Sequence, residues 1–217
     1  MYTVFASGHS GILKAKTALF ENVFVSRSSD GGQHWTPVQV FPGPPIITND
    51  NVFPAVAVDA TNGNVYATWS NLSGAGTNVY FSSSTDTGLT WSDPIIVNLA
   101  PAANTAVFPW VAANSGTVDV VYYGTSAASK DDPSAVWNVY LAQTTDNGAS
   151  FTQSLVSNTP NHNGVICTNG TACAPGTRNL LDLFQVKIDP LNGKAAIVYV
   201  DDTLTSPLPQ TVLAQQQ

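Results

Sequence analysis

The chain has 217 residues, of which 43% are hydrophobic and only 10% charged, and its formal net charge is −7. This length can bury a sizeable core, while no apolar run approaches the roughly 20 residues of a membrane helix. The seven Lys and Arg residues are spread singly, so we expect no nucleic-acid surface and no membrane surface. A glycan, another small molecule or a metal cation stays a candidate partner.

The chain opens with "MYTVFAS" at residues 1–7, which alternates like a strand. The opening "MYTVFASGHSG" lacks the basic start and the long apolar stretch of a signal peptide. An exported protein would therefore have lost its signal peptide or lack it in this sequence.

A short acidic segment follows the next predicted strand, residues 22–28. It reads "SSDGGQHW" at 28–35, returns as "STDTGLTW" at 84–91, and returns again as "TTDNGASF" at 144–151. We call these three segments the acidic turns. Their aspartates lie 56 and then 60 residues apart, a spacing typical of repeated structural units.

A second motif repeats in step with the acidic turns. Each copy is an alternating apolar run, a turn containing glycine and another alternating run, at residues 53–70, 108–124 and 184–200. This pattern predicts a β-hairpin. A third strand leads from each of the first two hairpins into an acidic turn, and a fourth strand follows that turn. The predicted unit is therefore four antiparallel strands, A to D, which is the blade of a β-propeller.

The predicted blades cover approximately 1–42, 50–98, 106–157 and 182–217, with a long inserted loop at 157–181. The first blade lacks strand A and the last lacks strand D. An open ring would expose apolar faces and strand edges, which favours association. Three arrangements stay open: a homodimer that closes the propeller, a fragment of a longer propeller, and a compact four-bladed ring.

The pattern S/T-x-D-x-G-x-T/S-W/F between strands C and D resembles the Asp-box, or BNR repeat, of sialidases and sialidase-like propellers. This resemblance implies an all-β, sialidase-like β-propeller with about four four-stranded antiparallel blades. It also implies that the turns lock the structure away from the central site. Such an aspartate accepts backbone hydrogen bonds, the glycine takes a positive φ, and the aromatic residue packs between blades. The structural residues are Asp30, Gly32, Trp35, Asp86, Gly88, Trp91, Asp146, Gly148 and Phe151.

Loops on the opposite face are the candidate site. The loop at 157–181 is expanded, since Phe184 lies 76 residues after Phe108 while Phe108 lies 55 after Phe53. Expanded loops on a binding face are often functional.

The catalytic candidates on these loops are Asp182, Asp50 and His162. The two carboxylates both precede a strand A, so they could share acid and base roles or bind a cation; alternatively, each caps a loop turn. His162 can titrate near neutral pH, although a histidine of this kind is often a plain surface residue.

The candidate substrate-binding residues are Arg178, Trp137, Asp201 and Asp202. Trp137 could offer a platform for stacking a sugar. The adjacent acids Asp201 and Asp202 could bind Ca²⁺ or steer a substrate, or they are solvated turn residues. We expect no other cofactor.

The two cysteines, Cys167 and Cys173, lie in the long loop. A small disulfide fits an exported protein, and two free thiols are the alternative. We expect no metal site here, because a closed zinc site needs four ligands and only His162 lies near the cysteines in sequence. The predicted location is secreted or extracytoplasmic.

The sialidase resemblance implies three arginines that hold the substrate carboxylate, a Tyr–Glu nucleophile pair and an aspartate acid/base. This chain has two arginines, Arg27 and Arg178, and one glutamate, Glu21. We therefore do not expect a true sialidase. Two hypotheses stay open: a glycan-related hydrolase that uses loop carboxylates on the face opposite the turns, and a non-catalytic exported propeller that binds carbohydrate or protein or acts as a scaffold.

Overall fold

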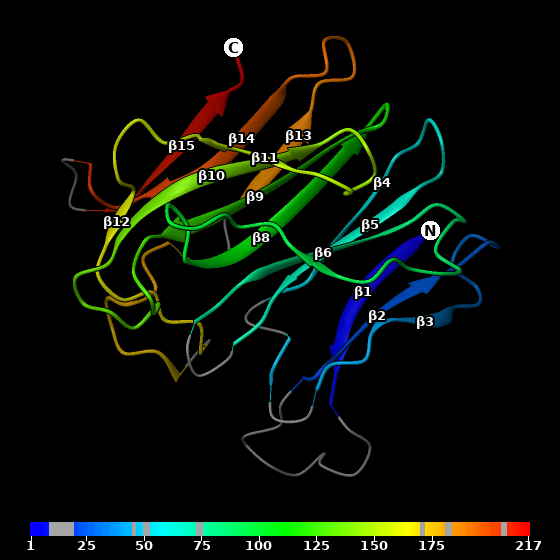
Figure 1. Ribbon diagram of the computed structural model, residues 1–217, viewed down its shortest axis with the longest axis horizontal. Coiled ribbons are helices and arrows are strands. Elements are labelled where there is room, and N and C mark those ends of the chain that lie inside the picture. Colours follow the sequence, from blue (N-terminus) through cyan, green and yellow to red (C-terminus); the bar gives the residue numbers. More distant parts are fainter. Residues whose placement is uncertain are drawn as a thin grey trace.

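The computed structural model describes residues 1–8, 20–44, 47–49, 53–72, 76–169, 172–180, 184–204 and 208–217. The elements in these residues are β-strands, numbered β1 to β15 along the chain (Figure 1). The described part of the chain contains no helix long and apolar enough to cross a membrane.

The first two sheets follow one another along the chain. The first has the order β1-β2-β3, and the second has the order β4-β5-β6-β7. Every pairing in both is antiparallel. Their strands are β1 (Tyr2–Ser7), β2 (Asn22–Arg27), β3 (Thr36–Phe41), β4 (Ala55–Val58), β5 (Val65–Ser70), β6 (Val79–Ser84) and β7 (Ile95–Ile96).

The other two sheets are also antiparallel. The third has the order β11-β10-β9-β8 with β12 added beside β10, and the fourth has the order β13-β14-β15. Their strands are β8 (Thr105–Asn114), β9 (Thr117–Thr125), β10 (Val136–Thr144), β11 (Thr152–Leu155), β12 (His162–Asn163), β13 (Gln185–Ile188), β14 (Ala195–Asp201) and β15 (Gln210–Gln215). The all-β class and the four-stranded antiparallel sheets are confirmed, whereas closure of a ring and the number of its blades stay predictions.

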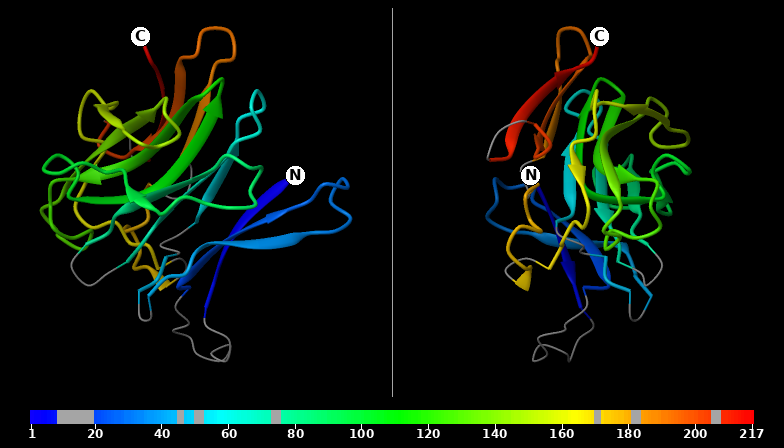
Figure 2. Two further views of the ribbon diagram at one scale, coloured as in Figure 1. Left: turned by 45° about the vertical axis from the view of Figure 1, so that its right-hand side comes forward. Right: turned by 90° about the vertical axis from the view of Figure 1, so that its left-hand side faces the viewer.

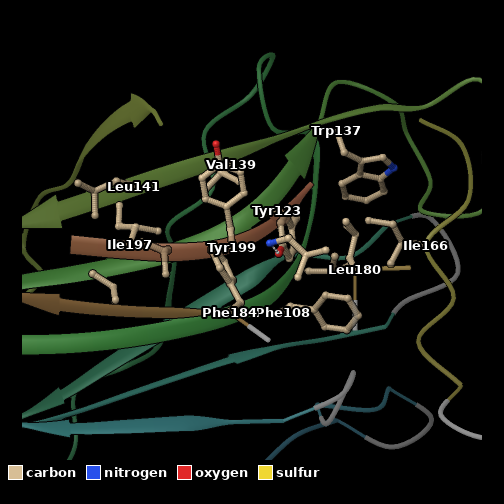
Figure 3. Close-up of a cluster of buried hydrophobic side chains, with 14 of the residues drawn as sticks. Phe108, Tyr123, Trp137, Val139, Leu141, Ile166, Leu180, Phe184, Ile197 and Tyr199 are labelled. Atoms are coloured by element: carbon tan, nitrogen blue, oxygen red, sulfur yellow. Dashed lines mark hydrogen bonds between the residues drawn. The ribbon is translucent and has the colours of Figure 1, made fainter. Parts of the chain in front are cut away.

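The sheets pack face to face in chain order (Figures 1 and 2). Three buried clusters separate them, one between each consecutive pair of sheets. Figure 3 shows the cluster between the third and fourth sheets, where Tyr123 stacks on Phe184 with ring centroids 4.5 Å apart. Because strand side chains alternate between faces, the middle sheets contribute one apolar set to each neighbour.

The three acidic turns share one hydrogen-bond pattern. The hydroxyl of the first residue donates to the aspartate two positions on, at 2.6 to 2.8 Å, and accepts the glycine N–H four positions on. The aspartate Oδ1 also accepts a backbone N–H from the residue four positions after it. Hydrogen bonds from that residue lower the pKa of each carboxyl, to about 2 in Asp30.

Each of the last two acidic turns also docks on the sheet before it. The Tyr2 hydroxyl donates to the carbonyl of Thr87 at 2.9 Å, and the Tyr66 hydroxyl donates to the side chain of Asn147 at 2.8 Å. Thr87 and Asn147 both follow the aspartate of their turn, and both have a positive φ. The two tyrosines hold equivalent places, since each pairs across its sheet with the residue just before an acidic turn.

A buried carboxylate stands in this tyrosine position in the third sheet. Asp119 pairs with Gln143, the residue before the third acidic turn, and is fully buried. The Gln143 amide donates to Oδ1 at 2.8 Å, but no donor among the described residues reaches Oδ2. Burial raises the pKa of Asp119 to about 6.

We predict that Gly148→Ala destabilises the fold more than Gly31→Ala does. Both glycines have a positive φ, but a Cβ on Gly148 would come within 2.3 Å of the Phe81 ring, whereas a Cβ on Gly31 would meet nothing within 4 Å. An alanine held at positive φ destabilises either variant by about 1 kcal/mol. Displacing the Phe81 ring destabilises Gly148→Ala by about 1 to 3 kcal/mol more. Urea unfolding measures both variants, and equal losses would contradict the docking of this turn on Phe81.

We also predict that stability falls as pH rises through the Asp119 titration. Burial holds the pKa of the folded carboxyl at about 6, against its ordinary value of 3.8, so the folded protein holds more protons than the unfolded chain between these two values. The free energy of unfolding then drops by about 3 kcal/mol between pH 4 and pH 7. The turn aspartates act below pH 3.8, outside this window. Urea unfolding measured between pH 4 and pH 7 should give a smaller change in the free energy of unfolding for Asp119→Asn than for wild type. The control Asp93→Asn, at an exposed position, should show the wild-type change.

Candidate functional site

The long loop lies at the end of the third sheet opposite its acidic turn. β10 runs from Val136 to Thr144 and enters the acidic turn at Thr144. Near its other end, Trp137 pairs with His162 of β12, which belongs to the long loop. The long loop and the third acidic turn are therefore separated by most of the nine-residue strand β10.

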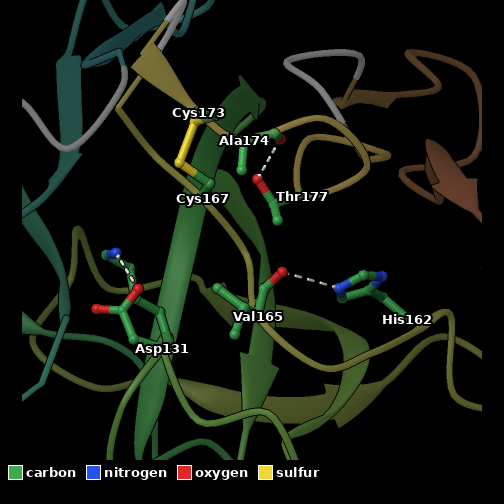
Figure 4. The surroundings of a disulfide bond; sticks show 8 residues. Asp131, His162, Val165, Cys167, Cys173, Ala174 and Thr177 are labelled. Atoms are coloured by element: carbon green, nitrogen blue, oxygen red, sulfur yellow. Dashed lines mark hydrogen bonds and ion pairs between the residues drawn. A yellow bond between two sulfur atoms is a disulfide. The ribbon is translucent and has the colours of Figure 1, made fainter.

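His162 and Asp202 form a mostly buried pair on this face. His162 Nδ1 lies 2.8 Å from Asp202 Oδ2, and the two side chains are 7% and 11% exposed. His162 Nε2 lies 3.3 Å from the Val165 carbonyl (Figure 4). Asn179 donates to the same Asp202 oxygen at 2.9 Å. The Asp202 carboxylate thus joins two points of the long loop to the end of β14.

Hydrogen bonds to backbone carbonyls hold this pair in place. The Asp202 N–H donates to the Asn161 carbonyl at 3.1 Å, and the side-chain amide of Asn161 donates to the Val200 carbonyl at 3.1 Å. The Thr203 hydroxyl donates to the Pro160 carbonyl at 2.8 Å. The start of the long loop is therefore fixed against the end of β14, which orients His162.

The rest of the long loop is fastened by a disulfide and by the core. Cys167 and Cys173 form a disulfide bond (Figure 4), and the Cys167 N–H donates to the Thr177 carbonyl at 3.0 Å. Ile166 and Leu180, on either side, are buried in the cluster between the third and fourth sheets (Figure 3). The loop therefore has apolar anchors at both ends of its disulfide segment.

The predicted site residues fall into different environments. Asp50 and Asp182 lie outside the described residues. His162 and Asp202 come together, while Arg178 is half-buried beside Asn179. Asp201 is buried, and its Oδ1 accepts the N–H and the hydroxyl of Thr203, as a turn aspartate does.

Trp137 does not offer a face to a sugar, which corrects that expectation. Its side chain is completely buried in the cluster between the third and fourth sheets, and its indole N–H donates to the Gly164 carbonyl at 2.9 Å. Position 137 falls on the inward-facing side of β10, so core packing decides its role.

Two residues of this region were missed by the sequence interpretation. Asn179 follows Arg178 in the expanded loop, and this position is the only feature of the sequence that could have singled it out. Lys130 is buried, and its ammonium pairs with Asp131 at 2.8 Å. The Lys130 carbonyl accepts the N–H of Ile166, so the Lys130 backbone helps to hold the long loop in place. Among the described residues, no group of three or more His, Cys, Asp and Glu side chains is arranged to hold a metal ion.

No protein-family model matches the chain, and no curated protein matches it. A solved structure from Dyadobacter fermentans, titled as a protein of unknown function, matches with a TM-score of 0.53 and 14% identity over 89% of this chain and 45% of that chain. This likeness concerns the fold alone.

Other matching structures are glycoside-processing enzymes by title. The GH93 α-L-arabinofuranosidase of Fusarium graminearum has a TM-score of 0.49 and 15% identity over 89% of this chain and 54% of that chain. The intramolecular trans-sialidase of Ruminococcus gnavus has a TM-score of 0.47 and 15% identity over 89% of this chain and 37% of that chain. This chain thus spans about half or less of the length of the three structures.

Proposed function

We propose that the chain forms part of a sialidase-like β-propeller in which the three acidic turns are Asp-boxes and the four sheets are blades. Two features support this: the turns repeat one hydrogen-bond pattern, and each sheet buries a face against the next. The division into blades at about 1–42, 50–98, 106–157 and 182–217 belongs to this proposal.

On this scaffold, the protein is a glycan-directed hydrolase whose site lies opposite the Asp-boxes. The observation that carries the assignment is the mostly buried His162–Asp202 pair, which joins the expanded loop to the end of β14 on that face. Asp182 and Asp50 are the acid/base candidates, Asp202 orients His162, and Arg178 contacts the substrate. Asp201 belongs to this face as the residue that shapes the turn before Asp202. The fold by itself does not select a substrate.

Turnover of a panel of aryl glycosides and aryl esters tests this proposal. We expect Asp182→Asn and Asp50→Asn each to lower kcat at least 100-fold, because general acid/base catalysis contributes about 10² to 10⁴ in rate. Asp202→Asn should lower it less, since that residue acts through His162.

Asp93→Asn is the matched control, because it makes the same change at an exposed position just after the second acidic turn. It should keep wild-type turnover. Equal rates in wild type and Asp182→Asn would remove Asp182 from the mechanism, and equal rates in all the site variants would overturn the hydrolase assignment.

A non-catalytic propeller that binds carbohydrate is the second candidate. One observation favours it: both ring nitrogens of His162 already face acceptors, Asp202 Oδ2 and the Val165 carbonyl. A histidine held in this way orders the loop and has no free nitrogen for a substrate. Glycan binding without turnover, lost in Arg178→Ala, would support this candidate.

We further propose that the protein is secreted or extracytoplasmic. The Cys167–Cys173 disulfide supports this location, because such bonds persist in oxidising compartments.

A homodimer that closes the ring also belongs to the proposal, and the open face of the first sheet supports it. Cross-strand aromatic pairs stack in three successive sheets, with centroids 5.6, 5.9 and 6.0 Å apart. Two of them, Trp69/Tyr80 and Tyr122/Tyr140, pack against the preceding sheet. The third pair is Phe5/Phe24 of the first sheet, where Phe5 is 39% exposed.

The open face of the fourth sheet is its counterpart. In the first three sheets, the residue three positions before the acidic turn is buried against the sheet that follows. These residues are Val25, Phe81 and Leu141. By the alternation of β15, Leu213 faces away from the third sheet and is 62% exposed. The fourth sheet of one copy can therefore cover the Phe5/Phe24 pair of another, and two such contacts close a ring.

Solution mass tests this association. We expect light scattering to give twice 22.8 kDa for wild type and a single-chain mass for Phe5→Ser or Leu213→Ser. Leu191→Ser is the control, because Leu191 lies 93% exposed in a turn away from both faces. A strict monomer at every concentration would contradict closure by a second copy.

A further inference from the structure

We propose that His162 is a pH-sensitive latch, whose doubly protonated ring fastens the long loop to the end of β14 and whose loss of one ring proton loosens that loop. Both ring nitrogens face an oxygen. Nδ1 lies 2.8 Å from Asp202 Oδ2, and Nε2 lies 3.3 Å from the Val165 carbonyl (Figure 4). The ring therefore bridges the long loop itself and the strand end against which the loop lies.

Only the protonated ring satisfies both of these oxygens. A neutral imidazole has one N–H donor and one lone pair, whereas the imidazolium donates at both nitrogens. In either neutral form, one ring nitrogen presents a lone pair to an oxygen of Asp202 or Val165. The His162 side chain is only 7% exposed, so water does not readily replace the missing hydrogen bond. Loss of a ring proton therefore removes one hydrogen bond from a buried contact.

The charges around the ring fit this behaviour. Among the described residues, Asp202 is the only ionisable side chain that pairs with the ring, and an anion at this distance stabilises the imidazolium. Lys130 pairs with Asp131 instead, and Asp201 is hydrogen-bonded to Thr203. The charged and titratable side chains of the described segments packed against His162, apart from Asp202, are Lys130, Asp131, Asp132, Tyr140, Arg178, Tyr199 and Asp201.

The latch meets both halves of the long loop at one carboxylate. Asn179 donates to the same Asp202 oxygen that faces His162, at 2.9 Å. Between these two contacts, the N–H groups of Ile166 and Cys167 donate to backbone carbonyls of neighbouring segments, both at 3.0 Å. A loop that loosens at Asp202 therefore exposes these two amide hydrogens to solvent more often.

The latch also bears on the proposed function. Arg178, the proposed substrate contact, directly precedes Asn179. If the loop loosens, this contact is no longer held in place, so substrate binding is strongest where the His162 ring is protonated. This consequence rests on the proposed function, whereas the latch itself does not.

Hydrogen exchange of the Ile166 and Cys167 amides tests the latch. We expect their protection, corrected for the chemical exchange rate at each pH, to fall about fivefold between about pH 5 and about pH 8. Histidine titrates in this range, and one hydrogen bond is worth a factor of about five. His162→Gln, which is neutral at every pH, should show the lower protection throughout.

His34→Gln is the matched control. His34 makes a similar contact, with Nδ1 2.6 Å from Asp30 Oδ2, but it lies in the first acidic turn and its side chain is 87% exposed. This variant should keep the wild-type pH profile of the long loop. The Gly148 amide, which donates to Thr144 Oγ1 at the other end of β10, is the internal reference, because it reports any effect of Asp119 titration on the third sheet.

Nitrogen NMR of wild-type protein with isotope-labelled histidine keeps the latch testable even if His162→Gln folds poorly. We expect both ring nitrogens of His162 to carry a proton while the loop is protected, and the protection to fall as one proton is lost. Constant protection across the pH range, an equal fall in His162→Gln, or a fall without loss of a ring proton would each overturn the latch. Exchange is measured without substrate, so none of these outcomes depends on hydrolase activity.

Discussion

The burial of each sheet by its neighbour is the constraint on which the rest of this structure depends. A four-stranded sheet has two faces, and alternation along each strand gives both of them apolar side chains. Tyr66 faces the third sheet, whereas Trp69, three residues later, faces the first. A middle sheet is therefore stable only with a partner on each side, which produces the stack.

In all three acidic turns the aspartate accepts backbone N–H groups of the turn, which keeps the turn compact. The last two acidic turns also contact the sheet that precedes them. Tyrosine hydroxyls from that sheet complete the contact at Thr87 and Asn147. At the third sheet Asp119 stands in the tyrosine position. Among the described residues only its Oδ1 accepts a hydrogen bond, from Gln143, and burial raises the pKa of this carboxyl.

The long loop occupies the opposite end of the third and fourth sheets. The long loop meets the end of β14 there, and one carboxylate, Asp202, holds both His162 and Asn179. The disulfide segment is fastened by the buried side chains Ile166 and Leu180. The long loop is thus held against rigid sheets at this end.

The sequence by itself determined the strands and their grouping, because strand alternation and turn chemistry are local properties that recur with a fixed period. It also singled out the expanded loop and His162, whose catalytic role stays a prediction. Only the tertiary structure decided that Asp202 is the partner of His162, that Trp137 is buried and that Asn179 joins the pair. The first and third of these outcomes depend on contacts between residues 40 and 23 positions apart, and the second depends on packing against the fourth sheet. A pattern along one strand carries no information about which side chain another segment supplies.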